Sequence, residues 1–295
     1  MFYVERKSFI IIFFLPADPS VYLPEKITGA MIIKKYKTGI VLSGGAARGF
    51  AHVGVLKALN EAGIYPDVIS GVSAGAIVGS LYADGYKPDE IIEIFGEKKM
   101  FNFIRLAIPN SGLARITGME EVMREHLRAK KFQDLEIPFF VAATNYNKGE
   151  IEYFNEGELL PRIIASASIP VLFAPVKIGD YSYVDGGVID NMPLEPLKGK
   201  CRKIIGVHVN PTGYTDEAEG IMKIAVRSFH LSVSAEINNK INSFNPYIEP
   251  EKLRNYGLLD VGHGREMFQI GYEKAKEVIS EKTNIRKRNN QTQGK

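Results

Sequence analysis

A serine set between glycines is the residue of this chain whose surroundings point most directly to chemistry. Ser73 is the centre of a G-x-S-x-G pattern, Gly71-Val72-Ser73-Ala74-Gly75. An apolar segment leads into the pattern, and small residues that favour a helix follow it. A sharp strand-to-helix turn exposes a serine hydroxyl in this way, with glycine where a side chain would clash. The pattern therefore predicts a nucleophile at Ser73, supported by Gly71 and Gly75.

A second glycine-rich segment lies upstream, and its residue types suit an oxyanion hole. Residues 44–49 read Gly-Gly-Ala-Ala-Arg-Gly and follow an apolar run. The segment lacks the Lys-Ser or Lys-Thr of a phosphate-binding P-loop, and Ala46 replaces a glycine of the dinucleotide fingerprint. Small residues before a helix can instead direct backbone N–H groups toward one point, as a tetrahedral intermediate requires. We expect Gly44, Gly45 and Ala46 to supply these donors, and Arg48 to hold the loop by hydrogen bonds to carbonyls.

The elements that position these segments are expected to alternate between strand and helix. Apolar runs predict strands at residues 38–43, 67–70, 137–144, 150–154, 175–178, 181–184 and 203–209. Helical spacing or composition predicts helices at residues 50–62, 74–84, 88–95, 119–127, 159–166, 222–239 and 265–281. This alternation predicts an α/β domain with a largely parallel sheet, in which functional loops gather at the carboxyl ends of the strands. The glycine loop and Ser73 are then neighbours at one sheet edge.

A third segment offers a carboxylate at the end of an expected strand. Asp185 is followed by Gly186 and Gly187, which allow other groups to approach closely. In this order and spacing, the glycine loop, the serine turn and the aspartate loop resemble the three blocks of the patatin-like phospholipase family. Residues 51–56 and 165–170 agree with the same family, and the resemblance extends over about residues 38–275. The small bacterial and archaeal members, little more than a core domain, are the most similar.

The resemblance implies a three-layer α/β/α domain with a central, mostly parallel sheet, and a serine acyl hydrolase that works without a cofactor. In the implied dyad, Ser73 attacks an ester carbonyl and Asp185 serves as general base and then general acid. Backbone N–H groups of Gly44, Gly45 and Ala46 bind the oxyanion, and water hydrolyses the acyl-enzyme. The substrate class is a lipid or another acyl ester. The sequence does not distinguish phospholipase A, lysophospholipase and thioesterase activities.

Two departures from the family pattern and two rival interpretations remain at this point. Ala46 stands where many members have a third glycine, and Asn145 stands where many have aspartate; Asn145 receives no catalytic role. One rival is an α/β-hydrolase with a Ser-Asp-His triad, completed by His208 or His263. The other is a non-enzymatic relative that binds acyl chains or a partner protein. No cluster of His, Asp and Glu has the spacing of a metal site, so none is expected.

The composition limits which partners and which cellular compartment are expected for the protein. The net charge of +3 over 295 residues is too small to indicate a nucleic-acid partner. The chain has one cysteine, Cys201, which cannot form an internal disulfide and favours a reducing, cytoplasmic compartment. Basic clusters near both ends of the chain are compatible with transient contact with an anionic membrane surface. Oligomeric state stays open.

The chain is expected to divide into three parts. Residues 1–34 form an extension outside the fold, residues 35–281 the hydrolase domain, and residues 282–295 a polar, basic and disordered tail. The apolar run at residues 9–15 is far shorter than the about 20 residues that span a bilayer, so an extension is favoured over an export signal. Residues 97–118 are apolar with glycines near their end, and a buried helical hairpin is favoured there over a mobile lid.

Overall fold

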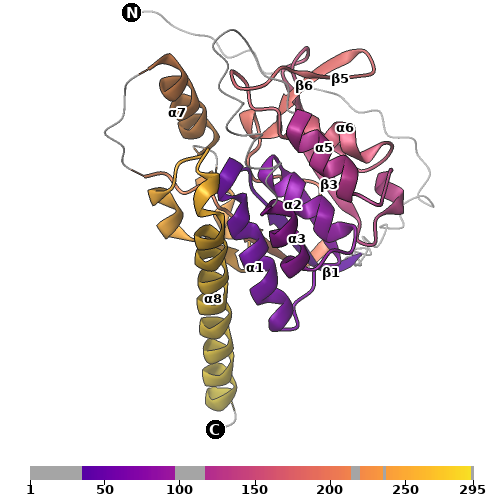
Figure 1. Cartoon of the computed structure of the whole chain (residues 1–295). Coiled ribbons are helices and arrows are strands. Elements are labelled where there is room, and N and C mark those ends of the chain that lie inside the picture. Colours follow the sequence, from indigo (N-terminus) through magenta and orange to yellow (C-terminus); the bar gives the residue numbers. More distant parts are fainter. Residues whose placement is uncertain (1–34, 97–116, 214–219, 235–236, 294–295) are drawn as a thin grey trace, which may run out of the picture. The chain divides into compact units, whose positions relative to one another are not determined.

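The computed structural model describes residues 35–96, 117–213, 220–234 and 237–293, and these are arranged around one sheet (Figure 1). The strands are β1 Tyr36–Leu42, β2 Val68–Val72, β3 Phe139–Asn145, β4 Glu150–Phe154, β5 Val176–Ile178, β6 Tyr181–Asp185, β7 Cys201–Val207 and β8 Tyr247–Ile248. Their order in the sheet is β5-β6-β3-β2-β1-β7-β8, and β4 also pairs with β3. Strands β3, β2, β1, β7 and β8 run parallel, whereas β4 and β6 run antiparallel to β3. The expected α/β class with a mostly parallel sheet is confirmed.

Helices flank this sheet. They are α1 Phe50–Glu61, α2 Ala74–Ala83, α3 Pro88–Phe95, α5 Thr117–His126, α6 Leu159–Ser166, α7 Ile221–Ser234 and α8 Gly264–Gln293. The long helix α8 lies along α1 (Figure 1), and glycines make the two helices approach closely. A Cβ at Gly54 would lie 1.9 Å from the Phe268 carbonyl oxygen, and a Cβ at Gly271 would lie 2.2 Å from that of Ala51. Glycine at these two positions therefore allows the C-terminal helix to dock on α1.

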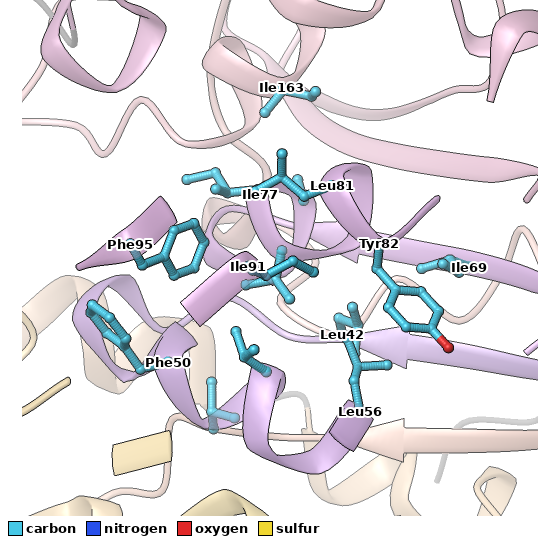
Figure 2. Close-up of a cluster of buried hydrophobic side chains, with 14 of the residues drawn as sticks. Leu42, Phe50, Leu56, Ile69, Ile77, Leu81, Tyr82, Ile91, Phe95 and Ile163 are labelled. Carbon is cyan, nitrogen blue, oxygen red and sulfur yellow. The ribbon is translucent and has the colours of Figure 1, made fainter. Parts of the chain in front are cut away.

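The central strand β1 is buried on both faces, and its alternate residues enter different hydrophobic clusters. Ile40 and Leu42 of β1 join the main core with α1, α2 and α3, whereas Val41 between them joins a second cluster. Figure 2 shows side chains of the main core, among them Leu42, Phe50 and Ile77. The second cluster is closed by residues from 192–201 and 237–244. Cys201 lies buried in it, which agrees with a packing role.

Three features differ from the sequence-based expectations or fall outside them. Helix α8 continues through Gln293, whereas a disordered tail was expected from residue 282. That segment is polar but contains neither proline nor glycine before Gly294, so its composition does not interrupt the helix. Helix α7 ends at Ser234, earlier than the predicted residue 239. The N-terminal extension and residues 97–116 of the hairpin-or-lid segment lie outside the described residues.

Candidate active site

The nucleophile candidate lies on the strand-to-helix turn that its glycines predict. Ser73 follows β2 and caps α2 with φ 53° and ψ −121°, a left-handed value of φ that is rare for a non-glycine residue. A Cβ at Gly75 would lie 2.2 Å from the Leu42 carbonyl oxygen, and a Cβ at Gly71 would lie 2.5 Å from that of Gly75. Glycine at both positions is therefore required if α2 is to start directly against β1.

The glycine loop lies beside this turn because β1 and β2 are adjacent and parallel, with Leu42 opposite Gly71. A Cβ at Gly44 would lie 3.2 Å from that of Ser73. The Gly44 N–H donates to Asn191 Oδ1 at 3.1 Å. Within the described residues, the N–H groups of Gly45 and Ala46 have no hydrogen-bond acceptor. Of the three donors expected in this loop, one is bound to a side-chain amide and two have no acceptor in the described part of the chain.

The Arg48 side chain holds the glycine loop in place by hydrogen bonds. Its guanidinium donates to the Tyr256 carbonyl oxygen at 3.0 Å and 2.7 Å, and to the Pro211 carbonyl oxygen at 3.2 Å. It also donates to Asn210 Oδ1 at 2.9 Å. Burial, together with repulsion from Arg227, lowers the pKa of Arg48 to about 10, so the side chain is charged at neutral pH. The buried cation therefore has its donors directed at fixed acceptors from a distant part of the chain.

Asp185 lies near Ser73 because one edge of β3 pairs with two different strands in turn. We call this point the fork of the sheet. Strand β4 occupies one edge of β3 along Val141 to Asn145. The other edge pairs first with β2, as far as Val72 opposite Ala142, and then with β6, from Asp185 opposite Ala143. The end of β2 and the end of β6 therefore meet on neighbouring residues of one strand. This register brings together two residues that are more than one hundred positions apart in the sequence.

The Asp185 carboxyl is almost completely buried, with 1% of the residue exposed. Its Oδ1 accepts the Gly187 N–H at 2.8 Å, and its backbone N–H donates to the Ser168 carbonyl oxygen at 2.9 Å. Oδ2 is buried without a hydrogen bond among the described residues. Burial raises the pKa of Asp185 to about 7, although the Ser73 hydroxyl and the Gly187 N–H lower it in part. A Cβ at Gly186 would lie 2.4 Å from the Ala142 carbonyl oxygen, so this neighbour must be glycine.

Two cavities meet at Ser73. The smaller, of about 20 Å³, is lined by Gly44, Gly45, Ala46, Ser73, Ile169, Asp185, Asn191, Asn210, Phe229 and Leu258. The larger, of about 80 Å³, has an almost wholly apolar lining of Ala46, Ala47, Gly49, Phe50, Ser73, Ala74, Ile77, Val78, Phe95, Met119, Ala167, Ile169, Phe173, Leu259 and Val261. Ser73, Ala46 and Ile169 line both. A polar compartment with the reactive groups therefore adjoins a compartment suited to a hydrocarbon chain.

The histidines considered for a triad lie elsewhere. His208 Nδ1 lies 2.9 Å from Glu249 Oε1 and 2.9 Å from the Tyr247 hydroxyl, and His263 Nδ1 lies 2.7 Å from Asp260 Oδ1. Neither histidine lines a cavity at Ser73. His52 donates through Nε2 to the Ser43 carbonyl oxygen at 2.8 Å, and burial lowers its pKa to about 4, so it is neutral. The geometry gives Ser73 a carboxylate neighbour and, within the described residues, no histidine.

Two polar residues that sequence reasoning missed also belong to this site. Asn191 binds the Gly44 N–H and lines the smaller cavity, while its Nδ2 is buried without a partner among the described residues. The Ser166 hydroxyl accepts the Ser73 N–H at 2.9 Å. Neither residue belongs to a glycine-rich pattern; the local signals were that Ser166 lies in the segment 165–170, which agrees with the family, and that Asn191 follows Asp185 closely in the sequence. Among the residues in the described ranges, no group of His, Cys, Asp and Glu could hold a metal ion.

The fold and the site together define an α/β protein that presents a serine on a strand-to-helix turn beside a glycine-rich loop and a buried aspartate. The model of the family described as Patatin-like phospholipase matches residues 40–198, and the chain belongs to this family. The chain is 29% identical to lysophospholipase nte1 of Emericella nidulans over 277 residues, which cover 82% of this chain and 18% of that protein. It is also 29% identical to lysophospholipase NTE1 of Kluyveromyces lactis over 270 residues, which cover 79% of this chain and 18% of that protein.

Among solved structures, the chain resembles VipD from Legionella pneumophila, with a TM-score of 0.51 and 16% identity. The similarity covers 84% of this chain and 67% of VipD and concerns the fold alone. The chain spans about a fifth of the length of the curated relatives it matches. The expected class, a hydrolase of lipid esters, is the one that the family model and the names of these relatives support. No helix in the described part of the chain is long and apolar enough to cross a membrane.

Proposed function

We propose that this protein is a serine acyl hydrolase that cleaves lipid esters with Ser73 and Asp185. The observation that carries the proposal is the smaller cavity, which is lined by Ser73, Asp185, Gly45 and Ala46 together. Ser73 Oγ bonds to the ester carbonyl carbon while Asp185 accepts the hydroxyl proton. The carbonyl oxygen becomes an oxyanion and accepts hydrogen bonds from the free loop donors, and the positive end of the helix that follows adds to this stabilisation.

The intermediate then collapses in a step that reverses the role of Asp185. The bond between the acyl carbon and the alcohol oxygen breaks, and Asp185 returns its proton to the leaving alcohol. Water next attacks the acyl-enzyme with Asp185 again as base, which frees the carboxylic acid and restores Ser73. A carboxyl with a pKa of about 7 suits both roles near neutral pH, because a useful fraction is ionised and the protonated form is still a competent acid.

The apolar cavity supports an acyl chain as the group that binds beside Ser73. Its lining contains Ile77, Val78 and Phe95 and, as far as the structure describes the chain, no charged side chain. The relatives named lysophospholipases make a lysophospholipid the first substrate to test. Such a substrate has one chain to bury and a polar headgroup that remains outside. Contact with a membrane surface while the lipid is taken up is part of this proposal.

A fluorophosphonate probe tests the proposal directly, because it phosphonylates an activated serine. The wild-type protein is expected to be labelled and to hydrolyse lysophospholipids, whereas Ser73→Ala abolishes both activities. Ser182→Ala, on the β5–β6 hairpin, serves as the matched control and is expected to behave as wild type. Wild-type protein that is neither labelled nor active would favour the acyl-binding alternative.

The rival triad is tested with the same assay. His208→Asn and His263→Asn are expected to retain activity within a few-fold of wild type, since neither side chain lines a cavity at Ser73. Loss of the triad base in a serine hydrolase lowers kcat by about 10⁴-fold or more. A loss of that size in either variant would show that the histidine, and not Asp185, is the base.

A further inference from the structure

Ser166 occupies the fork at which strand β3 passes from one neighbour to another. The ladder between β2 and β3 ends with Val72 opposite Ala142, and β6 takes over the same edge of β3 at Ala143. The chain turns away from the sheet at Ser73, so its N–H no longer continues the ladder. The Ser166 hydroxyl accepts that N–H at 2.9 Å and itself donates to the Ala142 carbonyl oxygen at 2.6 Å. One side chain thus replaces the hydrogen bond that the turn removes.

The backbone groups at the two ends determine the direction of the two Ser166 hydrogen bonds. A backbone N–H can only donate and a carbonyl oxygen can only accept, so the Ser166 proton points to Ala142 and a lone pair faces Ser73. Ser166 is the last residue of α6 and is completely buried. It lines neither cavity at Ser73, so it has no route to the substrate. Any effect of this residue on catalysis must pass through the backbone groups that it binds, the Ser73 N–H and the Ala142 carbonyl oxygen.

The backbone of Ser73 needs such an anchor. Its φ of 53° is unfavourable for a residue with a side chain, and conformations of this kind persist only where the surroundings hold them. Among the described residues, the hydrogen bond to Ser166 is what fixes its amide. A rotation at this residue would swing Oγ away from Asp185 and from the donors of Gly45 and Ala46.

We propose that Ser166 is a positioning residue that fixes the amide of the nucleophile at the sheet fork and so aligns Ser73 Oγ with Asp185 and the oxyanion donors. The proposal rests on the function proposed above. It assigns to the segment before Asp185 a role in the reaction and not only in packing. Because Ser166 does not touch the substrate, its loss must reduce the rate of bond formation at Ser73 without weakening substrate binding.

The test compares Ser166→Ala with Ser80→Ala. Ser80 is an equally buried serine, and its hydroxyl donates to the Ile77 carbonyl oxygen at 2.9 Å within α2. For Ser166→Ala, kcat and the rate constant for phosphonylation of Ser73 by a fluorophosphonate are expected to fall together by about 10- to 100-fold, since a displacement of about 1 Å can cost 10²-fold. KM, the reversible affinity for the probe and the midpoint of the pH profile should stay as in wild type. Ser80→Ala should keep wild-type rates.

Each other outcome contradicts the inference. Equal phosphonylation of wild type and Ser166→Ala would show that the hydroxyl does not position Ser73, while the proposed function would stand. A loss of rate that comes with weaker probe binding, and with a melting temperature far below that of Ser80→Ala, would assign Ser166 a general structural role. Failure of the wild-type protein to react at all would overturn the proposed function itself, and is thereby distinguished from failure of this inference.

Discussion

Replacing Asp185 by asparagine is expected to stabilise the fold while it abolishes hydrolysis. The asparagine side chain keeps an oxygen that can accept the Gly187 N–H, which the carboxyl accepts at 2.8 Å. It has no charge to bury and cannot take a proton from Ser73. The carboxyl proposed as the base is therefore expected to lower the free energy of unfolding at neutral pH.

The magnitude follows from the pKa. Burial raises the pKa of Asp185 from 3.8 to about 7, so the folded protein retains a proton that the unfolded chain releases near pH 4. The stability contributed by this proton is complete below about pH 4 and is lost as the pH rises to about 7. At 1.36 kcal/mol per pKa unit, the loss above pH 7 is about 4 kcal/mol. The variant Asp185→Asn would lack this dependence, because an amide does not titrate in this range.

Urea denaturation of wild type and Asp185→Asn at a series of pH values between 4.5 and 8.5 measures the effect. The difference in free energy of unfolding between the two proteins should grow with pH and level off above about pH 7. Asp84→Asn is the control, because Asp84 is a buried aspartate whose carboxylate accepts the Arg128 and Ala129 N–H groups. That substitution removes an acceptor and should destabilise the protein.

The result that would refute this reasoning is a difference between wild type and Asp185→Asn that does not change with pH. Asp185 would then ionise at the same pH in both states, and burial could not be the source of its basicity. The kinetic counterpart is a wild-type kcat/KM that rises with pH to a plateau with a midpoint near 7, since the carboxylate must be ionised to act as the base. A midpoint near 4 would contradict the same premise.

Three further substitutions test the loop and the apolar cavity. Ala46→Gly should raise the free energy of unfolding, measured in urea, by about 0.5–1 kcal/mol and keep activity, because Ala46 has φ 47° and glycine adopts this value without strain. Asn191→Ala should lower kcat/KM for p-nitrophenyl esters about tenfold, because the Gly44 N–H loses its acceptor and the glycine loop is no longer hydrogen-bonded to the residue that follows the aspartate loop. Val78→Phe should fill part of the apolar cavity and move the preference of kcat/KM within a series of acyl esters toward shorter chains. Unchanged chain-length preference would place the acyl group elsewhere.

The serine turn and the aspartate loop were predictable because close packing at both requires glycine, and glycine patterns are visible in the sequence. Gly71, Gly75 and Gly186 stand where a side chain would meet backbone atoms, and such positions leave a mark in the sequence. Arg48 was also expected from its loop, although its acceptors at Tyr256 and Asn210 could not be named.

Ser166 and Asn191 could not be found in this way. Each is an ordinary polar residue, and its partner lies 93 or 147 positions away in the sequence. Their roles depend on the fork of β3, where Asp185 meets Ala143 beside the end of β2. That register depends on long-range strand pairing, which no short pattern encodes. The extent of α8 could not be predicted for a different reason, because composition alone does not separate a polar helix from a disordered tail.

In the proposed function, the fork also explains how a dyad would replace a triad. An exposed aspartate, with a pKa near 4, is a weak base toward a serine, and hydrolases with a triad use histidine, whose pKa is near 6.5. Burial gives Asp185 a pKa of about 7, which is the basicity of an imidazole. That burial requires a carboxyl with few hydrogen-bond donors, and Asp185 has Gly187 on Oδ1 and none on Oδ2 among the described residues. Burial is therefore the origin of the raised pKa, the hydrogen bonds from Ser73 and Gly187 lower it only in part, and a further donor beside Oδ2 would lower it more.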